Sequence, residues 1–190
     1  RHIVKSSNGT VVTLYQGGVN PAGIRAKKST NNGNTWTDLA GNTGQSTQVD
    51  SSTTREFSIC LDASDNIYVA YETNNDIYFR KLTYSVFAST WTVGDPRWVE
   101  GPGSGLNVAC DYPSVIRESG GRVWVAYYLD DKQWNVSYME TKYSDNDFAT
   151  AGEFIDIEWD NMGMSSYYPA LILRNGYPYL VYQKIRCLLY

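Results

Sequence analysis

Four tyrosines at a nearly constant spacing organise the sequence. They are Tyr15, Tyr71, Tyr127 and Tyr182, which lie 56, 56 and 55 residues apart. Each tyrosine ends a run of alternating aromatic and β-branched residues, and each run follows a turn segment that contains Gly or Asn. Chance rarely produces such a spacing, so the chain is built from one structural unit used several times.

Each unit contains further short runs of β-forming residues. One precedes each turn, at residues 57–61, 113–116 and 169–173; a third follows each tyrosine, at residues 24–28, 77–82 and 136–142; a fourth lies around Trp36, at residues 91–93 and at residues 154–157. The first two runs predict a hairpin, because residues that tolerate positive φ separate them. No apolar stripe with helical spacing lasts three turns, so helices should be few and short.

Four antiparallel strands in a unit of about 50 residues are typical of a β-propeller blade. We therefore predict an all-β fold, a β-propeller with repeat units at residues 1–54, 55–110, 111–166 and 167–190. The fourth unit holds two strands and part of a third, so about three and a half blades are present. Propellers close with roughly four to eight blades. We expect the open strand edges to be covered by a second copy or by blades of a parent chain, so that the chain alone is no closed ring.

Charge excludes two classes of partner. The 190 residues carry 16 Lys and Arg against 20 Asp and Glu, a net charge of -4, and no block of basic residues occurs. Such a chain has no electrostatic means of binding a phosphate backbone or an anionic bilayer. No apolar run reaches the roughly 18 residues that a membrane span needs. Neither nucleic acid nor a membrane is an expected partner.

Cysteine and histidine are too sparse for a zinc site. Cys60, Cys110 and Cys187 show no C-x-x-C spacing, and the single histidine is His2. Three idle thiols, or one disulfide and one free thiol, both fit this count. We expect no cofactor, with Ca²⁺ at Asp130 and Asp131 as the alternative.

Residues 29–36, Ser-Thr-Asn-Asn-Gly-Asn-Thr-Trp, form a turn motif. Gly33 can adopt positive φ, the hydroxyls of Ser29 and Thr35 can bond the turn backbone, and Trp36 can pack between blades. The segment resembles the Asp-box, Ser-x-Asp-x-Gly-x-Thr-Trp, of the sialidase-like (BNR repeat) β-propellers. Asn31 stands where the family usually has Asp, and its amide can form the same local bond.

The box is less complete elsewhere in the chain. The second unit retains only Thr90 and Trp91, and we find no trace of the motif in the third. In the family the box is a structural turn between third and fourth strands, on the face opposite the functional one. It occurs in enzymes and in binding modules alike, so it predicts a fold and not an activity.

The resemblance implies a functional face at the propeller axis, where the innermost strands begin. The residues at that phase of the repeat are Arg55, Asp111 and Tyr167. Sialidases use the same residue types, since arginines clamp the substrate carboxylate, a tyrosine is the nucleophile and carboxylates transfer protons. The three residues are therefore catalytic and binding candidates, or merely polar residues that open strands. The other arginines fall at the opposite turns, in the outer strands or at the terminus, so no arginine triad is complete.

Loops on the same face add aromatic and acidic side chains. These ligand-binding candidates are Glu72, Asp76, Tyr128, Asp130, Asp131 and Trp134. Sugar rings stack on exposed aromatic rings, and carboxylates accept hydrogen bonds from their hydroxyls. A solvated loop with Trp134 folded back as packing is the alternative.

The resemblance favours a secreted or cell-surface propeller segment that recognises a saccharide and is not catalytic by itself. Part of a glycoside hydrolase of the exo-sialidase type is the first alternative. A polysaccharide lyase is a weaker one, and a protein-interaction scaffold is the least specific.

Overall fold

A computed structural model describes residues 2–18, 23–52, 56–101, 108–131, 136–150, 152–160 and 165–186. These residues form antiparallel sheets and contain no helix. The first sheet has the order β1 (Ile3–Lys5), β2 (Val11–Gln16), β3 (Ile24–Ser29), β4 (Thr47–Asp50). The second has β5 (Phe57–Leu61), β6 (Ile67–Thr73), β7 (Asp76–Ser85) and β8 (Thr90–Val93), and β9 (Arg97–Glu100) also pairs with β7.

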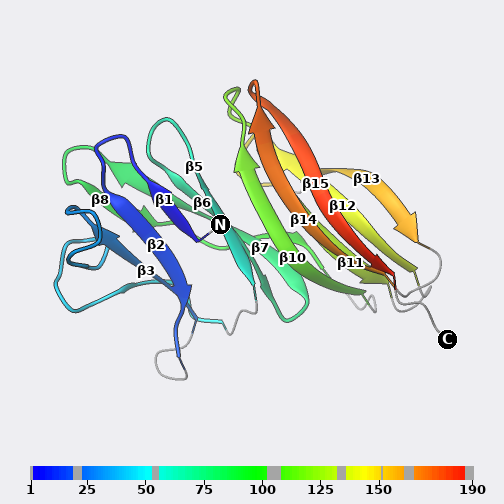
Figure 1. The fold of residues 1–190 in the computed structure, drawn as a ribbon, viewed down its shortest axis with the longest axis horizontal. Helices are drawn as coiled ribbons and strands as arrows, with labels where there is room; N and C mark the ends of the chain where they lie inside the picture. Colours follow the sequence, from blue (N-terminus) through cyan, green and yellow to red (C-terminus); the bar gives the residue numbers. More distant parts are fainter. Residues whose placement is uncertain are drawn as a thin grey trace.

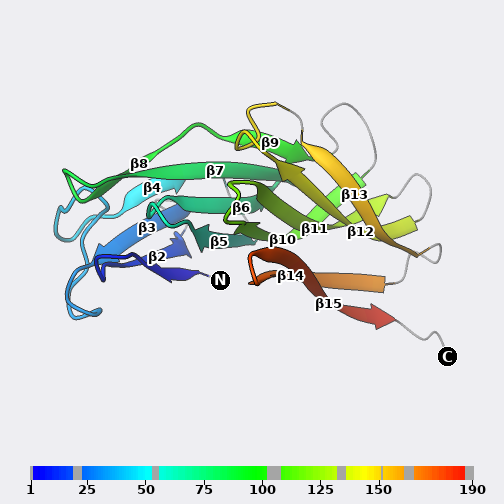
Figure 2. The ribbon, with the colours of Figure 1, turned by 90° about the horizontal axis from the view of Figure 1, so that it is seen from above.

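The third sheet has the order β10 (Val108–Arg117), β11 (Val123–Asp131), β12 (Val136–Ser144), β13 (Glu153–Asp160). The fourth holds β14 (Ser165–Arg174) and β15 (Tyr177–Arg186). We refer to the sheets as blades 1 to 4. They stand side by side in chain order (Figure 1). Seen from above, the first strands β5 and β10 lie on one side of the row and β8, β9 and β13 on the other (Figure 2). The chain is thus an all-β, partial β-propeller.

The four tyrosines occupy equivalent places, as the spacing predicts. Tyr71 pairs with Phe57, and Tyr182 pairs with Pro169, which lies 112 residues after Phe57. All four lie in second strands, but β11 and β15 each continue four residues beyond their tyrosine. The prediction that the tyrosines end these strands is therefore wrong for blades 3 and 4.

The hairpin turns repeat with the same step. The backbone N–H groups of Ser6, Asp62 and Glu118 each donate to the carbonyl four residues later, at 2.9, 3.0 and 3.0 Å. The predicted hairpins are confirmed in every blade, because β1–β2, β5–β6, β10–β11 and β14–β15 are all antiparallel pairs.

The predicted outer strand around Trp36 is wrong. Only two isolated bridges form there, both at Thr37, and the outer strand of blade 1 is β4. The intervening loop is compact because the Asp38 carboxylate accepts bonds from the backbone and side chain of Asn42, at 2.7 and 2.8 Å. Leu39, fully buried, anchors the loop in the core.

The turn at residues 29–36 forms as its residues predict. The N–H of Gly33 donates to Ser29 Oγ at 2.8 Å, and the N–H of Thr35 donates to Asn31 Oδ1 at 2.9 Å. Asn31 Nδ2 donates to Thr35 Oγ1 at 2.9 Å, so the amide bonds the turn from both of its ends. Gly33 has φ +91°, where a side chain would be strained.

Blade 3 contains the same turn, contrary to the sequence reading that the motif is absent there. The N–H of Phe148 donates to Ser144 Oγ at 2.8 Å, and Asn146 Nδ2 donates to Thr150 Oγ1 at 3.0 Å. Phe148 takes the place of Gly33 at φ +58°. Its ring is buried 5.4 Å from that of Phe79 in blade 2, and this packing offsets the left-handed backbone.

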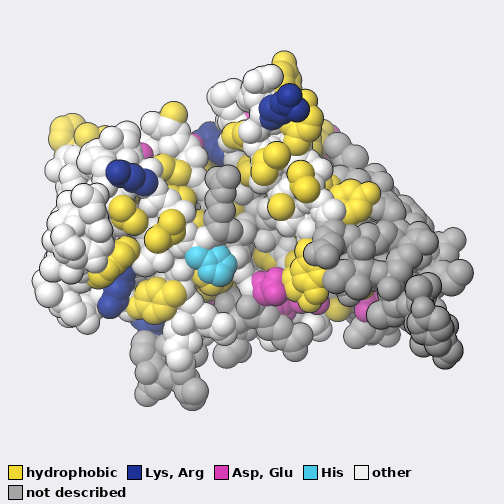
Figure 3. Space-filling model, in the orientation of Figure 1, with side chains coloured by type: hydrophobic (Ala, Val, Ile, Leu, Met, Phe, Trp, Pro, Cys, Tyr) yellow, Lys and Arg dark blue, Asp and Glu magenta, His cyan; other side chains and the backbone are white. Residues whose placement is uncertain are grey.

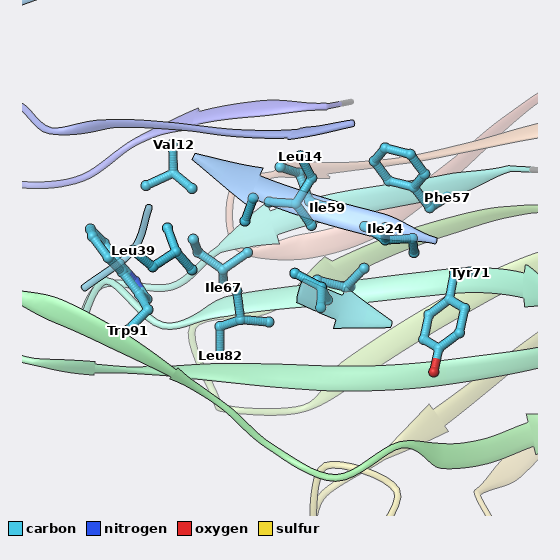
Figure 4. Packing of buried hydrophobic residues seen from close by; sticks show 13 residues of the cluster. Val12, Leu14, Ile24, Leu39, Phe57, Ile59, Ile67, Tyr71, Leu82 and Trp91 are labelled. Carbon is cyan, nitrogen blue, oxygen red and sulfur yellow. The ribbon is translucent and has the colours of Figure 1, made fainter. Parts of the chain in front are cut away.

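Apolar clusters fill the spaces between blades. Figure 4 shows the cluster between blades 1 and 2, where Leu14 and Ile24 meet Phe57 and Ile59. A second cluster joins blades 2 and 3 and includes Cys60 and Cys110, two buried cysteines. Cys187 lies outside the described residues.

Inner strands of neighbouring blades are also linked by one repeated hydrogen bond. The N–H of Val115 donates to Ser58 Oγ at 2.7 Å, and the N–H of Leu171 donates to Ser114 Oγ at 2.9 Å. Donor and acceptor each move by 56 residues, so blades 2, 3 and 4 are related by the same repeat.

An ion pair joins the outer strand of blade 1 to blade 2. Arg80 on β7 donates to Asp50 Oδ2 through Nη2 at 2.8 Å, and the Tyr71 hydroxyl donates to the same oxygen at 2.8 Å. Burial alone would raise the pKa of Asp50, but hydrogen bonds from the Ser52 N–H, Tyr71 and Arg80 outweigh it and lower that pKa.

Blades 2 and 3 are joined in the same way by Lys142 on β12 and Glu100 at the end of β9. In the strand register, Arg80 lies opposite Val69 on β6, and Lys142 lies opposite Val125 on β11. Val125 lies one repeat after Val69, so the two cations occupy equivalent positions. Asp50 and Glu100 each lie beside a β-bulge, opposite Ile24 and Ile77 respectively. We call this contact the inter-blade ion pair.

We predict that Gly33→Val lowers the melting temperature by several degrees. The left-handed conformation costs a β-carbon roughly 1 to 2 kcal/mol, whereas space is available, since an added Cβ would meet only the Trp36 ring at 3.8 Å. Differential scanning calorimetry gives the shift. Gly18→Val is the matched control, because an added Cβ there meets no atom within 4 Å. Equal melting temperatures for the two variants would contradict the turn assignment.

We predict that Asp50→Asn destabilises the fold far more than Asp145→Asn. The first leaves Arg80 without its counter-charge in a buried contact, at a cost of about 3 kcal/mol. The second breaks a solvent-exposed pair with Arg122, which should change the stability little. Urea unfolding at pH 7 measures both. Because the folded-state pKa of Asp50 is depressed, the contribution of its charge is present above the unfolded pKa and disappears as pH falls through the folded value. The gap between wild type and Asp50→Asn should therefore close in acid.

Candidate functional site

The inner strands of blades 2, 3 and 4 begin at one face of the molecule. The turn between β6 and β7 reaches the same face, because the carbonyl of Asn75 accepts the N–H of Cys110 near the start of β10 at 3.0 Å. Acidic side chains gather near the start of β5 in Figure 3. We call this end of the inner strands the axial face.

Three tyrosines of blades 3 and 4 lie together on the axial face. The Tyr112 and Tyr168 rings are 4.4 Å apart between centroids and inclined at 49°, and the Tyr128 ring is 6.4 Å from that of Tyr112. A hydrogen bond with Tyr168, followed by burial, raises the pKa of Tyr112 to about 12. The Tyr168 side chain is 41 % exposed. The group therefore offers an aromatic surface with hydroxyl groups at its edge.

A β-bulge produces this arrangement. The pairing of β10 with β11 shifts between Asp111 and Ser114, and Tyr112 within the bulge has φ +57°. A bulged strand re-aims the side chain of its extra residue. Left-handed backbone in a residue with a bulky side chain is uncommon and often marks a functional position.

Three carboxyl groups, those of Glu56, Glu72 and Asp111, lie near one another on the axial face. Burial, followed by the charges of Asp111 and Glu72, raises the pKa of Glu56. The N–H of Glu72 donates to the Glu56 carbonyl at 3.0 Å, which fixes the ends of β5 and β6 to each other. Glu72 is almost fully buried, and its Oε1 accepts the N–H of Asn75 at 3.0 Å. Glu72 thus supports the turn, while Glu56 and Asp111 are both half-buried.

The remaining predicted residues are spread along two edges of the face. The Tyr128 hydroxyl donates to Ser137 Oγ at 3.0 Å, and Ser137 lies 3.4 Å from Asp130 Oδ1. Asp131 is one residue further along β11. Asp76, at the start of β7, accepts the indole N–H of Trp98 at 3.3 Å. Arg55 and Trp134 lie outside the described residues, and of Tyr167 the backbone pairing with Lys184 is described.

The structure adds residues that lie one position after the predicted ones. Glu56, Tyr112 and Tyr168 follow Arg55, Asp111 and Tyr167 along the inner strands, and they share the same 56-residue step. Tyr112 and Tyr168 stand at the same position of successive repeat units, and this recurrence in the sequence could have identified them as site residues.

Two hollows continue from this face along the inner strands. The first, about 220 Å³, is lined by β5, β10 and β14, among others by Phe57, Pro113 and Pro169. The second, about 540 Å³, also has residues of β1 in its wall. Within the described ranges, no three His, Cys, Asp or Glu side chains are grouped to bind a metal ion. No helix in the described part of the chain could span a membrane.

The fold belongs to the class of β-propellers, and its solved relatives were found by structure alone. No family model matches the sequence, and no curated protein matches it. A Penicillium chrysogenum α-L-arabinanase complexed with arabinobiose has a TM-score of 0.65 at 13 % identity, over 96 % of this chain and 56 % of that chain. Hadza microbial sialidase Hz136 has a TM-score of 0.58 at 13 % identity, over 89 % of this chain and 38 % of that chain.

An ulvan lyase bound to a glucuronate–rhamnose sulfate ligand has a TM-score of 0.56 at 11 % identity, over 97 % of this chain and 52 % of that one. This chain therefore spans between 38 % and 56 % of the length of these three structures. At these identities the likeness establishes the propeller fold.

We predict that Asp111→Asn lowers the pKa of Glu56 toward its ordinary value. Removing the Asp111 charge favours ionisation of Glu56, while burial, the larger cause, stays. A ¹³C NMR titration of the Glu56 carboxyl group measures the change. Asp145→Asn, in the exposed Arg122 pair, is the control. An unchanged Glu56 titration in Asp111→Asn would show that the two groups do not interact.

Proposed function

We propose that the axial face binds a carbohydrate and that this chain alone does not hydrolyse it. The observation that carries the proposal is the juxtaposition of Tyr112 and Tyr168 with Glu56 and Asp111. Sugar rings present C–H groups that pack on aromatic rings, and their hydroxyls hydrogen-bond to carboxylates. The structural likeness to an arabinanase, a sialidase and a lyase supports this proposal.

Charge suggests which sugars bind best. The carboxyl groups whose charges act on Tyr112 and raise its pKa are those of Glu56 and Asp111. The cations Arg80 and Lys142 are held in inter-blade ion pairs. We therefore expect neutral oligosaccharides to bind more tightly than sialosides.

The test is titration calorimetry with arabino-oligosaccharides and with sialyllactose. Tyr168→Ala should weaken binding about five- to tenfold, which corresponds to the loss of about 1 kcal/mol of aromatic contact. Tyr177→Ala, exposed at the opposite end of the blade, should leave the affinity unchanged. Equal effects of both substitutions would refute the location of the site. Repeating the titration with EDTA tests the proposal that no Ca²⁺ is needed.

A glycoside hydrolase is the second candidate, favoured by the raised pKa of Glu56 next to Asp111. A carboxyl group that stays protonated can act as general acid toward a glycosidic oxygen, and a neighbouring carboxylate can act as base or nucleophile. Release of 4-methylumbelliferone from arabinosides or sialosides, lost in Glu56→Gln, would establish this activity. Arg55→Ala should weaken only sialoside binding. No binding and no turnover would leave a protein-interaction scaffold.

We also propose a secreted or cell-surface location. Polymeric glycans of the kinds named for the structural relatives are met outside the cell, and a face that binds them would operate there.

A further inference from the structure

A hollow of about 320 Å³ lies where blades 1 and 2 meet, beside the inter-blade ion pair. Its wall includes the end of β4, strand β6 with the turn that follows it, and strand β7. Among the lining residues are Asp50, Tyr71, Thr73, Asn74, Tyr78 and Arg80. These side chains all carry polar groups, unlike the mostly apolar walls of the two hollows along the inner strands. We call this site the polar hollow.

The two charges in the wall neutralise each other. Arg80 donates to Asp50 Oδ2 through Nη2 and to the Gly94 carbonyl through Nη1, each at 2.8 Å. The other oxygen of Asp50 accepts the N–H of Ser52 at 2.8 Å. The Tyr71 hydroxyl, which also donates to Asp50, points away from the apolar cluster in Figure 4. The described wall therefore favours a neutral ligand, because burying an uncompensated charge is costly.

Thr73 contributes a hydrogen-bonding group that lacks a partner. Its side chain is 5 % exposed, and its hydroxyl oxygen is buried without a hydrogen bond. An unpaired buried hydroxyl has a free-energy cost. A ligand in the polar hollow that offers a hydroxyl group of its own would remove this cost.

Tyr78 contributes an aromatic ring and a second hydroxyl group. Its half-buried ring stacks on that of Tyr71, with 5.9 Å between centroids and an angle of 25°. Burial, followed by the charges of Asp76 and Asp50, raises the pKa of Tyr78, so its hydroxyl stays protonated at neutral pH. An aromatic ring next to hydroxyl groups suits a sugar, whose C–H groups pack on rings and whose hydroxyls both donate and accept.

The next pair of blades has the ion pair but not these hydroxyl groups. Leu129 on β11 lies one repeat after Thr73. Glu140 on β12 has the register position of Tyr78, since each lies opposite a tyrosine of the 56-residue spacing. Both Leu129 and Glu140 are buried. The repeat therefore requires the ion pair, whereas the hydroxyl groups of the polar hollow are particular to blade 2.

We propose that the polar hollow binds a neutral monosaccharide, which packs on Tyr78 and exchanges a hydrogen bond with Thr73. Asn74, exposed in the turn after Thr73, adds an amide that can donate and accept. The polar hollow is formed by blades 1 and 2, whereas Tyr112 and Tyr168 belong to blades 3 and 4. The proposal therefore does not rest on the function of the axial face.

The test is a ¹H–¹⁵N NMR titration of the chain with D-glucose, D-galactose and L-arabinose, and with D-glucuronate as the charged comparison. At least one neutral sugar should shift the amide signals of Thr73, Asn74 and Tyr78, and glucuronate should bind more weakly. Thr73→Val should weaken binding about tenfold, as expected for one lost hydrogen bond. It should not lower the melting temperature, because the hydroxyl has no partner in the free protein.

Thr141→Val is the matched control, because the Thr141 hydroxyl on β12 is also buried without a partner but does not line the polar hollow. It should leave sugar binding unchanged. Thr73→Leu, which introduces the residue of the equivalent position in blade 3, should fill the hollow and abolish binding. The signal shifts at Thr73 should persist in Tyr168→Ala, since that substitution alters the axial face alone.

Four results would each overturn the proposal. They are no shift of these signals with any of the three neutral sugars, glucuronate binding as tight as that of the neutral sugars, equal sugar affinities of Thr73→Val and Thr141→Val, and loss of the shifts in Tyr168→Ala. The last result would mean that the sugar occupies the axial face. Loss of axial binding with these shifts retained would count against the proposed function alone.

Discussion

The ion pair between an outer-strand acid and a third-strand cation of the next blade sets the geometry on which the rest depends. Apolar burial between blades is strong but non-directional, so it does not define how far one sheet is rotated against the next. A charged contact with fixed partners does define this rotation, because an unpaired charge in a buried interface has a high free-energy cost. Asp50 with Arg80, and Glu100 with Lys142, therefore hold the register between blades. The axial face follows, because residues one repeat apart then point at the same axis.

Most of the fold could be predicted because one structural unit recurs along the chain. A pattern that is recognised in one blade therefore applies to the other blades as well. The spacing of the tyrosines located every hairpin, since turn, strand and inter-blade contact all move by one step. Outer strands were harder. Trp36 suggested a strand, but only isolated bridges at the next residue, Thr37, form there. The turn at Ser144 was hidden by Phe148, whose burial replaces the conformational freedom that Gly33 supplies.

The residues that the structure brings together on the axial face lie one position after the predicted ones along the inner strands, and that difference has a physical cause. Successive side chains of a strand point to opposite faces of the sheet. The repeat therefore predicts how far along the propeller axis a residue lies, but not toward which face its side chain points. The bulge at Tyr112 changes the direction of the side chains locally, and no pattern of residue types in the sequence predicts this bulge. Glu56 was missed for another reason, since its importance comes from neighbours on other strands.

The two thiols between blades 2 and 3 give this interface a built-in reporter. Cys60 and Cys110 are both packed in the cluster that joins these blades, and burial, followed by nearby acids, raises the pKa of Cys110. The thiolate is the species that alkylating reagents attack. Modification of Cys110 must therefore wait until the two blades part, and the rate of labelling in native buffer would count those openings. The alkylation rate of Cys110 thus reports how often blades 2 and 3 of this partial propeller separate.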